Sequence, residues 1–444
     1  MKKEGSFLKR ILSVGLASSI MLLSSCEGTG TQLLDFIDPD AEKNQIEEIA
    51  QEAYSNMIKN YWCETDTYSY LQNPYKPYRT DTFSDIMWVY VQGLLGFETY
   101  YAASGDESVL EYVKKQFETW LGHYGESWLL ATGKDNNPCC DDAAWTSMGF
   151  LLWYKLLGEE KALDYCHDMI KNSYDFWQDE TTANGLWYSY SENFSEGDPT
   201  NWEKSLYSVG LMLSSLELHQ IKIGTDREDS ELWERTLALY EWTEKNLRRD
   251  QTFDYNGTPV EVNDNLYFLG RYDNHETGES YPSGIHYPNG INPAGSCSAL
   301  FANMGMAVFN KRMYDITGED IYLEKAVSTA NALTGDIYTR NGILINDRDA
   351  WTNCSFIGYF VREVLPLAGN DPKLGKIIFD TAVSIRDNNY FEGYDGSDWS
   401  GDTVWFNNGD LGHPTYFENS ATSTHLIYAA YYAAVNDLID FEQK

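Results

Sequence analysis

The sequence has little positive charge. It carries 32 lysines and arginines against 68 aspartates and glutamates, which gives a formal net charge of −36 over 444 residues. So acidic a chain repels phosphate backbones, which excludes nucleic acid as a partner and disfavours polyanionic substrates. A neutral substrate fits this charge best.

Metal-binding and disulfide patterns are also lacking. The seven histidines show no HExxH or comparable ligand spacing, so we expect no catalytic metal and no cofactor. The seven cysteines form neither zinc-like pairs nor a dense disulfide framework. We expect buried thiols, since a vicinal disulfide between Cys139 and Cys140 would be far from the usual bridge geometry.

Long apolar runs are confined to the first residues. MKKEGSFLKR is cationic, ILSVGLASSIMLL is apolar but too short to span a membrane, and LSSC ends the segment at Cys26. This pattern resembles a bacterial lipoprotein signal peptide over residues 1–25, which implies lipidation of Cys26 and anchoring in the bacterial outer membrane. An ordinary signal peptide is the alternative. Residues 26–40 are a predicted tether, and one domain is expected over 41–444.

Apolar periodicity and capping residues predict twelve helices. They lie near residues 42–61, 84–103, 106–121, 141–157, 159–177, 203–221, 229–248, 296–316, 319–334, 352–367, 372–387 and 417–436. No alternating pattern typical of a strand competes over any long stretch.

The connections between these helices alternate in length. Most even-numbered helices are followed by short turns such as SGDE, GEE and TGED, and the odd-numbered ones by long loops. Even helices are apolar on most faces, whereas odd helices are amphipathic. Six inner and six outer helices in alternation predict an all-α protein, an (α/α)6 barrel or toroid of six helical hairpins. The site is expected at the end with the long loops, where the inner helices begin.

Aromatic residues gather in those long loops, for example in NGLWYSYSENF and DGSDWSGDTVWF, and make up 15% of the chain. Flat ring faces beside polar side chains suit sugars, which have apolar C–H faces and polar rims. Any one of these rings could instead pin a loop to the barrel.

Two adjacent carboxylates, Asp141 and Asp142, open the fourth predicted helix. Capping is the simpler explanation, because aspartate is favoured at helix starts. One cap suffices, however, and a second carboxylate on an inner helix faces the cleft, where neighbouring like charges favour a shared proton. Such a pair can divide the roles of acid and nucleophile. Retaining glycoside cleavage needs carboxyl groups about 5–5.5 Å apart, which consecutive residues can reach.

Other carboxylates could partner one member of the pair, although solvation at the surface is the simpler explanation for each. These residues, which lie near predicted inner-helix starts, are Asp85, Glu203, Asp347, Asp349 and Glu418.

The chain resembles family 76 of the glycoside hydrolases, the endo-acting α-1,6-mannanases, which have an (α/α)6 barrel. The resemblance rests on DDAAW (141–145), GLWYSYSENF followed by EKSLYSVGLML, FNKRMYDITGEDIYLEKAVSTANALT and FIGYFVREVLPLA. It implies that Asp141 is the nucleophile, that Asp142 is the general acid/base, and that the substrate is α-mannan or its oligosaccharides. The residues expected to bind substrate are Trp88, Trp145, Trp187, Tyr188, Lys204 and Asn303.

The chain departs from the family pattern at three points. Cys139 and Cys140 stand where aromatic residues often precede the pair, LFANMG replaces Tyr-Asn-Gln-Gly, and Ile357 replaces a lysine. These departures concern the subsites and the substrate more than the fold.

Two other functions therefore stay open. An unsaturated glucuronyl hydrolase would need basic residues to seat a uronate, and a glycan-binding lipoprotein without catalysis would explain the anchor, the acidity and the aromatic residues. A monomer is expected.

Overall fold

The computed structural model describes residues 39–71, 87–124, 140–178, 185–186, 203–255, 258–273, 280–282, 286–287, 290–291, 298–345, 355–367, 373–388, 390–391, 394–395, 421–439 and 441. The chain divides into two compact units, Met1–Asp38 and Pro39–Lys444. Cys26 and the predicted signal peptide lie outside the described residues. The architecture below is that of the second unit.

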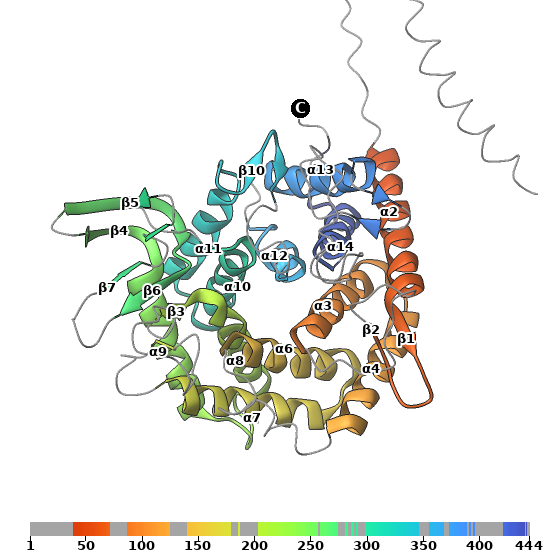
Figure 1. Ribbon diagram of the computed structural model, residues 1–444, viewed down its shortest axis with the longest axis horizontal. Helices are drawn as coiled ribbons and strands as arrows, with labels where there is room; N and C mark the ends of the chain where they lie inside the picture. Colours follow the sequence, from red (N-terminus) through yellow and green to blue (C-terminus); the bar gives the residue numbers. More distant parts are fainter. Residues whose placement is uncertain are drawn as a thin grey trace, which may run out of the picture. The chain divides into compact units, whose positions relative to one another are not determined.

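Twelve described α-helices form two rings, one inside the other (Figure 1). The inner helices are α3 (Met87–Ser104), α6 (Cys140–Leu157), α8 (Val209–Lys222), α10 (Leu300–Thr317), α12 (Ile357–Glu363) and α14 (Ala421–Val435). Each inner helix contacts the next, and α14 returns to contact α3, so the inner ring closes. The outer helices are α2 (Pro39–Tyr61), α4 (Ser108–Tyr124), α7 (Glu160–Trp177), α9 (Ser230–Leu247), α11 (Asp320–Ala332) and α13 (Lys373–Asn388). The predicted alternation of inner and outer helices is confirmed.

Side-chain burial explains which helices form which ring. In the outer helix α7, Leu163, Cys166 and Ile170 are buried at helical spacing while the opposite face is polar. In the inner helix α6, every residue from Ala143 to Trp153 is buried. An all-apolar helix is stable only when other helices surround it, so such helices form the inner ring.

The inner helices all run in the same direction. A Cβ atom added at Gly210, near the start of α8, would lie 3.5 Å from Cβ of Ala144, near the start of α6. A Cβ atom at Gly305, near the start of α10, would lie 2.9 Å from Val209 at the start of α8. Short turns return the chain to the outer ring, as at Gly158, whose φ of +73° suits glycine. The N-terminal ends of the inner helices therefore meet at one end of the ring.

Three inner helices begin later than the sequence predicted, at residues 209, 300 and 357 rather than near 203, 296 and 352. Before α8, strand β3 (Glu203–Ser205) pairs with β6 (Gly270–Asp273), and the 3-10 helix η4 (Leu206–Ser208) follows. The Ser205 side chain accepts the backbone N–H of Tyr207 at 3.1 Å. This local hydrogen bond competes with the α-helix and delays its start.

The expectation of no long strand is wrong. Strands β4 (Arg248–Tyr255) and β5 (Thr258–Tyr267) form an antiparallel hairpin. The sequence between them is Asn-Gly, a typical hairpin turn signal that the helical periodicity analysis missed. The other strands are β1 (Trp62–Glu64), β2 (Ser69–Leu71), β7 (Ser280–Pro282), β8 (His286–Tyr287), β9 (Gly290–Ile291), β10 (Thr339–Arg340), β11 (Ile343–Leu344), β12 (Tyr390–Phe391) and β13 (Tyr394–Asp395).

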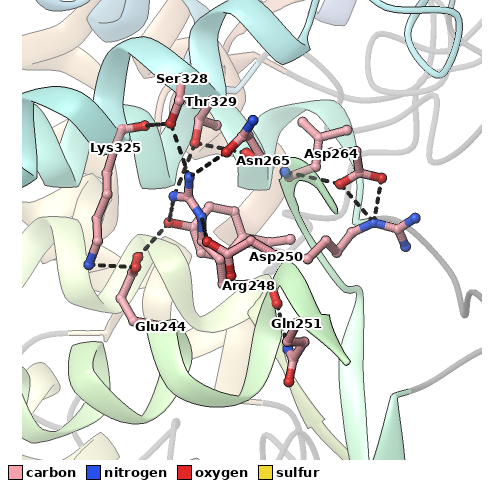
Figure 2. A network of polar contacts seen from close by, with 12 residues as sticks. Glu244, Arg248, Asp250, Gln251, Asp264, Asn265, Lys325, Ser328 and Thr329 are labelled. Atoms are coloured by element: carbon pink, nitrogen blue, oxygen red, sulfur yellow. Dashed lines mark hydrogen bonds and ion pairs between the residues drawn. The ribbon is translucent and has the colours of Figure 1, made fainter. Parts of the chain in front are cut away.

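A polar network fastens the β4–β5 hairpin to helices α9 and α11 (Figure 2). Arg248 donates to the hydroxyls of Tyr267 and Ser328, each at 3.0 Å. Glu244 pairs with Lys325 at 2.8 Å. Charge-assisted bonds of this kind are stronger than neutral ones, so the hairpin is held firmly against the ring.

Three cysteines lie in the described part of the chain, and Cys63, Cys140 and Cys166 are all buried, as predicted. Burial raises the pKa of the Cys166 thiol. Among the described helices, none combines the length and the apolarity needed to cross a membrane.

Candidate active site

Asp141 and Asp142 lie in the first turn of α6. They are the only residues between Cys140 and Trp153 that are not buried. Two partly exposed aspartates therefore stand at the N-terminal end of a helix whose central residues, Ala143 to Trp153, are enclosed by protein.

A local hydrogen bond orients the carboxylate of Asp141. The backbone N–H of Asp142 donates to Oδ1 of Asp141 at 3.0 Å. The Thr146 hydroxyl donates to the carbonyl of Asp142 at 2.9 Å. Because α6 begins at Cys140, both aspartates are inside the first turn and neither is the residue before the helix. The first turn of α6 and the N–H of Asp142 both place positive partial charge beside the Asp141 side chain.

A layer of aromatic rings lies next to the start of α6, where Trp145 follows Asp141 by about one helical turn. Trp145 stacks on Phe356 with ring centroids 5.5 Å apart and lies 5.7 Å from Phe301. Tyr207 stacks on the other side of Phe301 at 5.4 Å. Trp145, Phe301 and Phe356 are buried, whereas Tyr207 is partly exposed. We call these four residues the aromatic layer; it gives the site an apolar floor.

One buried polar pair adjoins this floor. The hydroxyl of Ser355, next to Phe356, donates to Oε1 of Gln92 on α3 at 2.7 Å. The amide nitrogen of Gln92 is buried and has no hydrogen-bond partner among the residues that the structure describes. Whichever way the amide is turned, one of its polar atoms stays unsatisfied, which costs free energy in a core.

The structure describes only some of the predicted substrate-binding residues. Trp145 is 3% exposed and belongs to the aromatic layer. Asn303 is completely buried: its Oδ1 accepts the Tyr267 N–H at 3.0 Å and its Nδ2 donates to the Tyr338 hydroxyl at 2.8 Å. Asn303 thus joins the end of β5 to the start of α10, and its amide is occupied by protein groups. Substrate contact by Trp145 or Asn303 stays a prediction.

The remaining predicted residues fall outside the description. Trp187 and Tyr188 lie outside the described residues, and only the backbones of Trp88 in α3 and Lys204 in β3 are described. Of the five other acidic candidates, only Glu203 has a described backbone, which lies in β3. The other four, Asp85, Asp347, Asp349 and Glu418, lie outside the described residues.

At the opposite end, near the C-termini of the inner helices, charged residues of both signs alternate. They are Glu98 on α3, Lys155 on α6, Glu217 on α8, Arg312 on α10, and Arg362 and Glu363 on α12. We call these six residues the charged ring. Lys155 lies 3.6 Å from Glu98 and 2.9 Å from Glu217. Arg312 lies 2.9 Å from Glu217 and 2.7 Å from Glu363, and Arg362 lies 2.7 Å from Glu98.

The charged ring surrounds Tyr359. Its three cations lie over the Tyr359 ring, with Lys155 at 4.6 Å, Arg312 at 4.9 Å and Arg362 at 5.1 Å from the centroid. Burial alone would raise the pKa of Glu217, but Lys155 and Arg312 outweigh it and lower that pKa to about 2. Its ion pairs therefore persist at neutral and mildly acidic pH.

The described residues contain no group of three or more His, Cys, Asp or Glu side chains arranged to hold a metal ion. The chemistry available at the described site is that of two carboxylates above an apolar floor.

Sequence reasoning missed both the aromatic layer beyond Trp145 and the charged ring. The ring did leave a signal, because single charged residues stand near the ends of otherwise apolar stretches, as in FLLWYKLLG and LMLSSLELH. A charge on a helix predicted to be buried implies a partner of opposite sign. The members of the aromatic layer lie more than 50 residues apart in sequence, and no local pattern connects them.

Comparisons with known proteins were made by sequence and by structure. No protein-family model and no curated protein matches the chain. Among solved structures, an α-1,6-mannanase of family 76 from Salegentibacter sp. HEL1_6 matches with a TM-score of 0.61 and 17% identity, over 87% of this chain and 98% of that one. The fold is an (α/α)6 barrel. The resemblance to family 76 is thus confirmed at the level of the fold.

Other solved structures with this barrel differ in activity. A family 76 glycoside hydrolase from a bovine Bacteroides thetaiotaomicron strain matches with a TM-score of 0.62 and 16% identity, over 88% of this chain and 78% of that one. An unsaturated glucuronyl hydrolase specific for heparin matches with a TM-score of 0.55 and 12% identity, over 91% of this chain and all of that one. An inactive variant of the Salegentibacter enzyme, with two consecutive aspartates replaced by alanine, was solved in complex with α-1,6-mannotetrose.

Proposed function

We propose that the protein is an endo-acting glycoside hydrolase that cleaves α-1,6-mannosidic bonds in α-mannan with retention of configuration. The observation that carries the proposal is the pair Asp141 and Asp142, which is partly exposed at the N-terminal end of an inner helix whose residues from Ala143 to Trp153 are all buried. The (α/α)6 barrel shared with family 76 mannanases supports the proposal. A second support is the inactive variant of the Salegentibacter enzyme, in which two consecutive aspartates are replaced by alanine.

The two carboxylates take different roles in this proposal. Asp141, held by the Asp142 N–H at the start of α6, is the nucleophile that attacks the anomeric carbon. Asp142 is the acid that protonates the leaving oxygen and then the base that activates water. Adjacent like charges resist simultaneous ionisation, so one member of the pair is favoured in the protonated form that the acid needs.

A neutral sugar fits the described site better than a uronate. Uronate recognition needs a cation near the sugar carboxylate. The cations that the structure describes on inner helices α6, α10 and α12 include Lys155, Arg312 and Arg362, and each is paired with carboxylates at the far end of the ring. The floor below the aspartate pair is aromatic. The aromatic floor supports a neutral sugar such as mannose as the substrate.

Product analysis tests the proposal. The protein is incubated with unbranched α-1,6-mannan and, separately, with an unsaturated uronyl disaccharide, and products are followed by chromatography and proton NMR. We expect mannan fragments of several lengths with the α-anomer formed first. Release of unsaturated uronate would instead support the second enzyme class, and binding of mannan without cleavage would support a glycan-binding protein.

We further propose that the mature protein is anchored in a bacterial outer membrane through lipidated Cys26, because a basic segment, a short apolar run and LSSC precede it. The variant Cys26→Ser should leave the membrane fraction, since a lipid chain is the expected anchor. If the variant stays in salt-washed membranes to the same extent as the wild type, the lipoprotein proposal is refuted.

A further inference from the structure

Tyr207 lies level with the aspartate pair. Helices α6 and α8 run in the same direction and meet where Ala144 faces Gly210 at 3.5 Å. Asp141 lies three residues before Ala144, and Tyr207 lies three residues before Gly210. Each step towards the N-terminus covers about 4.5–6 Å. The 3-10 helix that carries Tyr207 also contacts α6 directly. Tyr207 is therefore at about the same level as Asp141, at the end of the ring where the inner helices begin.

The Tyr207 ring is backed by other rings. Phe301 stacks on it at 5.4 Å and 27°, and Trp145 lies behind Phe301 at 5.7 Å. Tyr207 is the only member of the aromatic layer that is not buried. Its ring is thus the part of the apolar floor that reaches the level of the carboxylates.

The backbone of Tyr207 is also fixed. Its N–H donates to Oγ of Ser205 at 3.1 Å, and the N–H of Leu206 donates to the carbonyl of Leu269 at 2.9 Å. Ser205 belongs to β3, which pairs with β6. The main chain of Tyr207 is fixed by hydrogen bonds and its ring by stacking on Phe301. Such a side chain loses little conformational freedom when it binds a ligand.

We propose that Tyr207 is the platform that receives the apolar C–H face of the sugar next to the bond being cleaved, and so contributes to substrate specificity. The proposal rests on the proposed function and assigns a residue to it. An aromatic face suits the C–H surface of a neutral pyranose, and a stacked sugar excludes water from the carboxylates beside it. A sugar whose apolar face is blocked should bind less well.

The test is calorimetric titration with α-1,6-mannotetraose on a background of Asp141→Asn and Asp142→Asn, which prevents turnover. Adding Tyr207→Ala should weaken binding by about five- to a hundredfold, as expected for loss of a partly buried aromatic contact. Tyr207→Phe should bind within about threefold of the background, because the ring face is kept. Tyr322→Ala is the matched control, since Tyr322 is also partly exposed but lies on the outer helix α11; it should have no effect.

The outcomes separate the two proposals. If the background protein binds no mannotetraose and the wild type cleaves no mannan, the proposed function fails. If the background binds and Tyr207→Ala binds equally well, the platform proposal alone is overturned. A lowered melting temperature with unchanged affinity also overturns it, because Tyr207 would then only support the barrel. In the cleaving enzyme, Tyr207→Ala should lower kcat/KM by the same factor, and Tyr207→Phe should restore it.

Discussion

At the end of the barrel where the inner helices begin, two carboxylates of the same helix stand next to each other above an aromatic floor. At the other end, three carboxylates alternate with three cations from five inner helices, around a tyrosine. Opposite charges that pair in a core hold helices together, and removing one partner is costly. Like charges side by side give no such stabilisation. Under the proposed function the far end serves stability and the near end serves chemistry, and substitutions should separate the two.

The largest expected effect is on turnover at the near end. Asp141→Asn should abolish cleavage of every substrate, because an amide cannot serve as the nucleophile. Asp142→Asn should slow mannan cleavage by about 10²–10⁴-fold, and an activated aryl α-mannoside that the enzyme accepts should lose less, since its leaving group needs no acid. Steady-state rates on both substrates measure this.

Both variants should stay folded, because asparagine stabilises a helix start nearly as well as aspartate. Circular dichroism and melting curves provide this control. If both folded variants cleave mannan at nearly the wild-type rate, the two aspartates only stabilise the start of the helix. The proposed function would then be wrong.

The next effect is on stability at the far end. Arg312→Met removes the cation shared by Glu217 and Glu363 and should lower the free energy of unfolding by about 3–5 kcal/mol, as loss of one partner in a buried network does. The rate per folded molecule should barely change. Urea denaturation and active-site titration measure both. Arg227→Met is the control, because Arg227 pairs with Glu160 and Asp164 at the surface, where an ion pair contributes about 0–1 kcal/mol. Equal losses in the two variants would show that the charged ring has no special role.

A smaller effect is expected from pH, because Lys155 and Arg312 each keep a second carboxylate partner, Glu98 and Glu363, when Glu217 is protonated. The pKa of Glu217 is about 2 in the folded protein against 4.5 ordinarily. A lowered pKa means that the ion pairs of Glu217 contribute stability above pH 4.5, and that this contribution is lost as the pH falls from 4.5 towards 2. Urea titrations across this range should show a steeper loss of stability in the wild type than in Glu217→Gln. Parallel curves would contradict the assignment.

The smallest effect concerns the contact between helices below the aspartate pair. A Cβ atom at Gly305 would lie 2.9 Å from Val209 and 3.0 Å from Phe356, so Gly305→Ala should destabilise the protein by about 1–3 kcal/mol. At Gly210 the nearest atom would be at 3.5 Å, an ordinary contact, and alanine is the better helix former by about 0.8–1.0 kcal/mol. Gly210→Ala should therefore be neutral or slightly stabilising. Melting temperatures compare the two, and a reversal of their order would refute the packing described here.

Much of the architecture could be predicted from the sequence. Helix periodicity identified all twelve described helices, and the contrast between apolar and amphipathic helices assigned them to the inner and outer rings. The late start of α8 could not be predicted in this way, because a hydrogen bond from Ser205 and pairing with β6, about 65 residues away, decide it. The β4–β5 hairpin was missed although its turn sequence was present.

The sequence by itself determined which helix carries the adjacent aspartates and that this helix is buried, because both follow from local composition and period. Only the tertiary structure decided what surrounds the pair. Tyr207, Phe301 and Phe356 come from three other segments, and close approach at Gly210 and Gly305 brings them to Trp145. The charged ring likewise joins residues up to 264 positions apart. Such contacts depend on the packing of the inner helices into a ring, which brings together side chains that are far apart in the sequence.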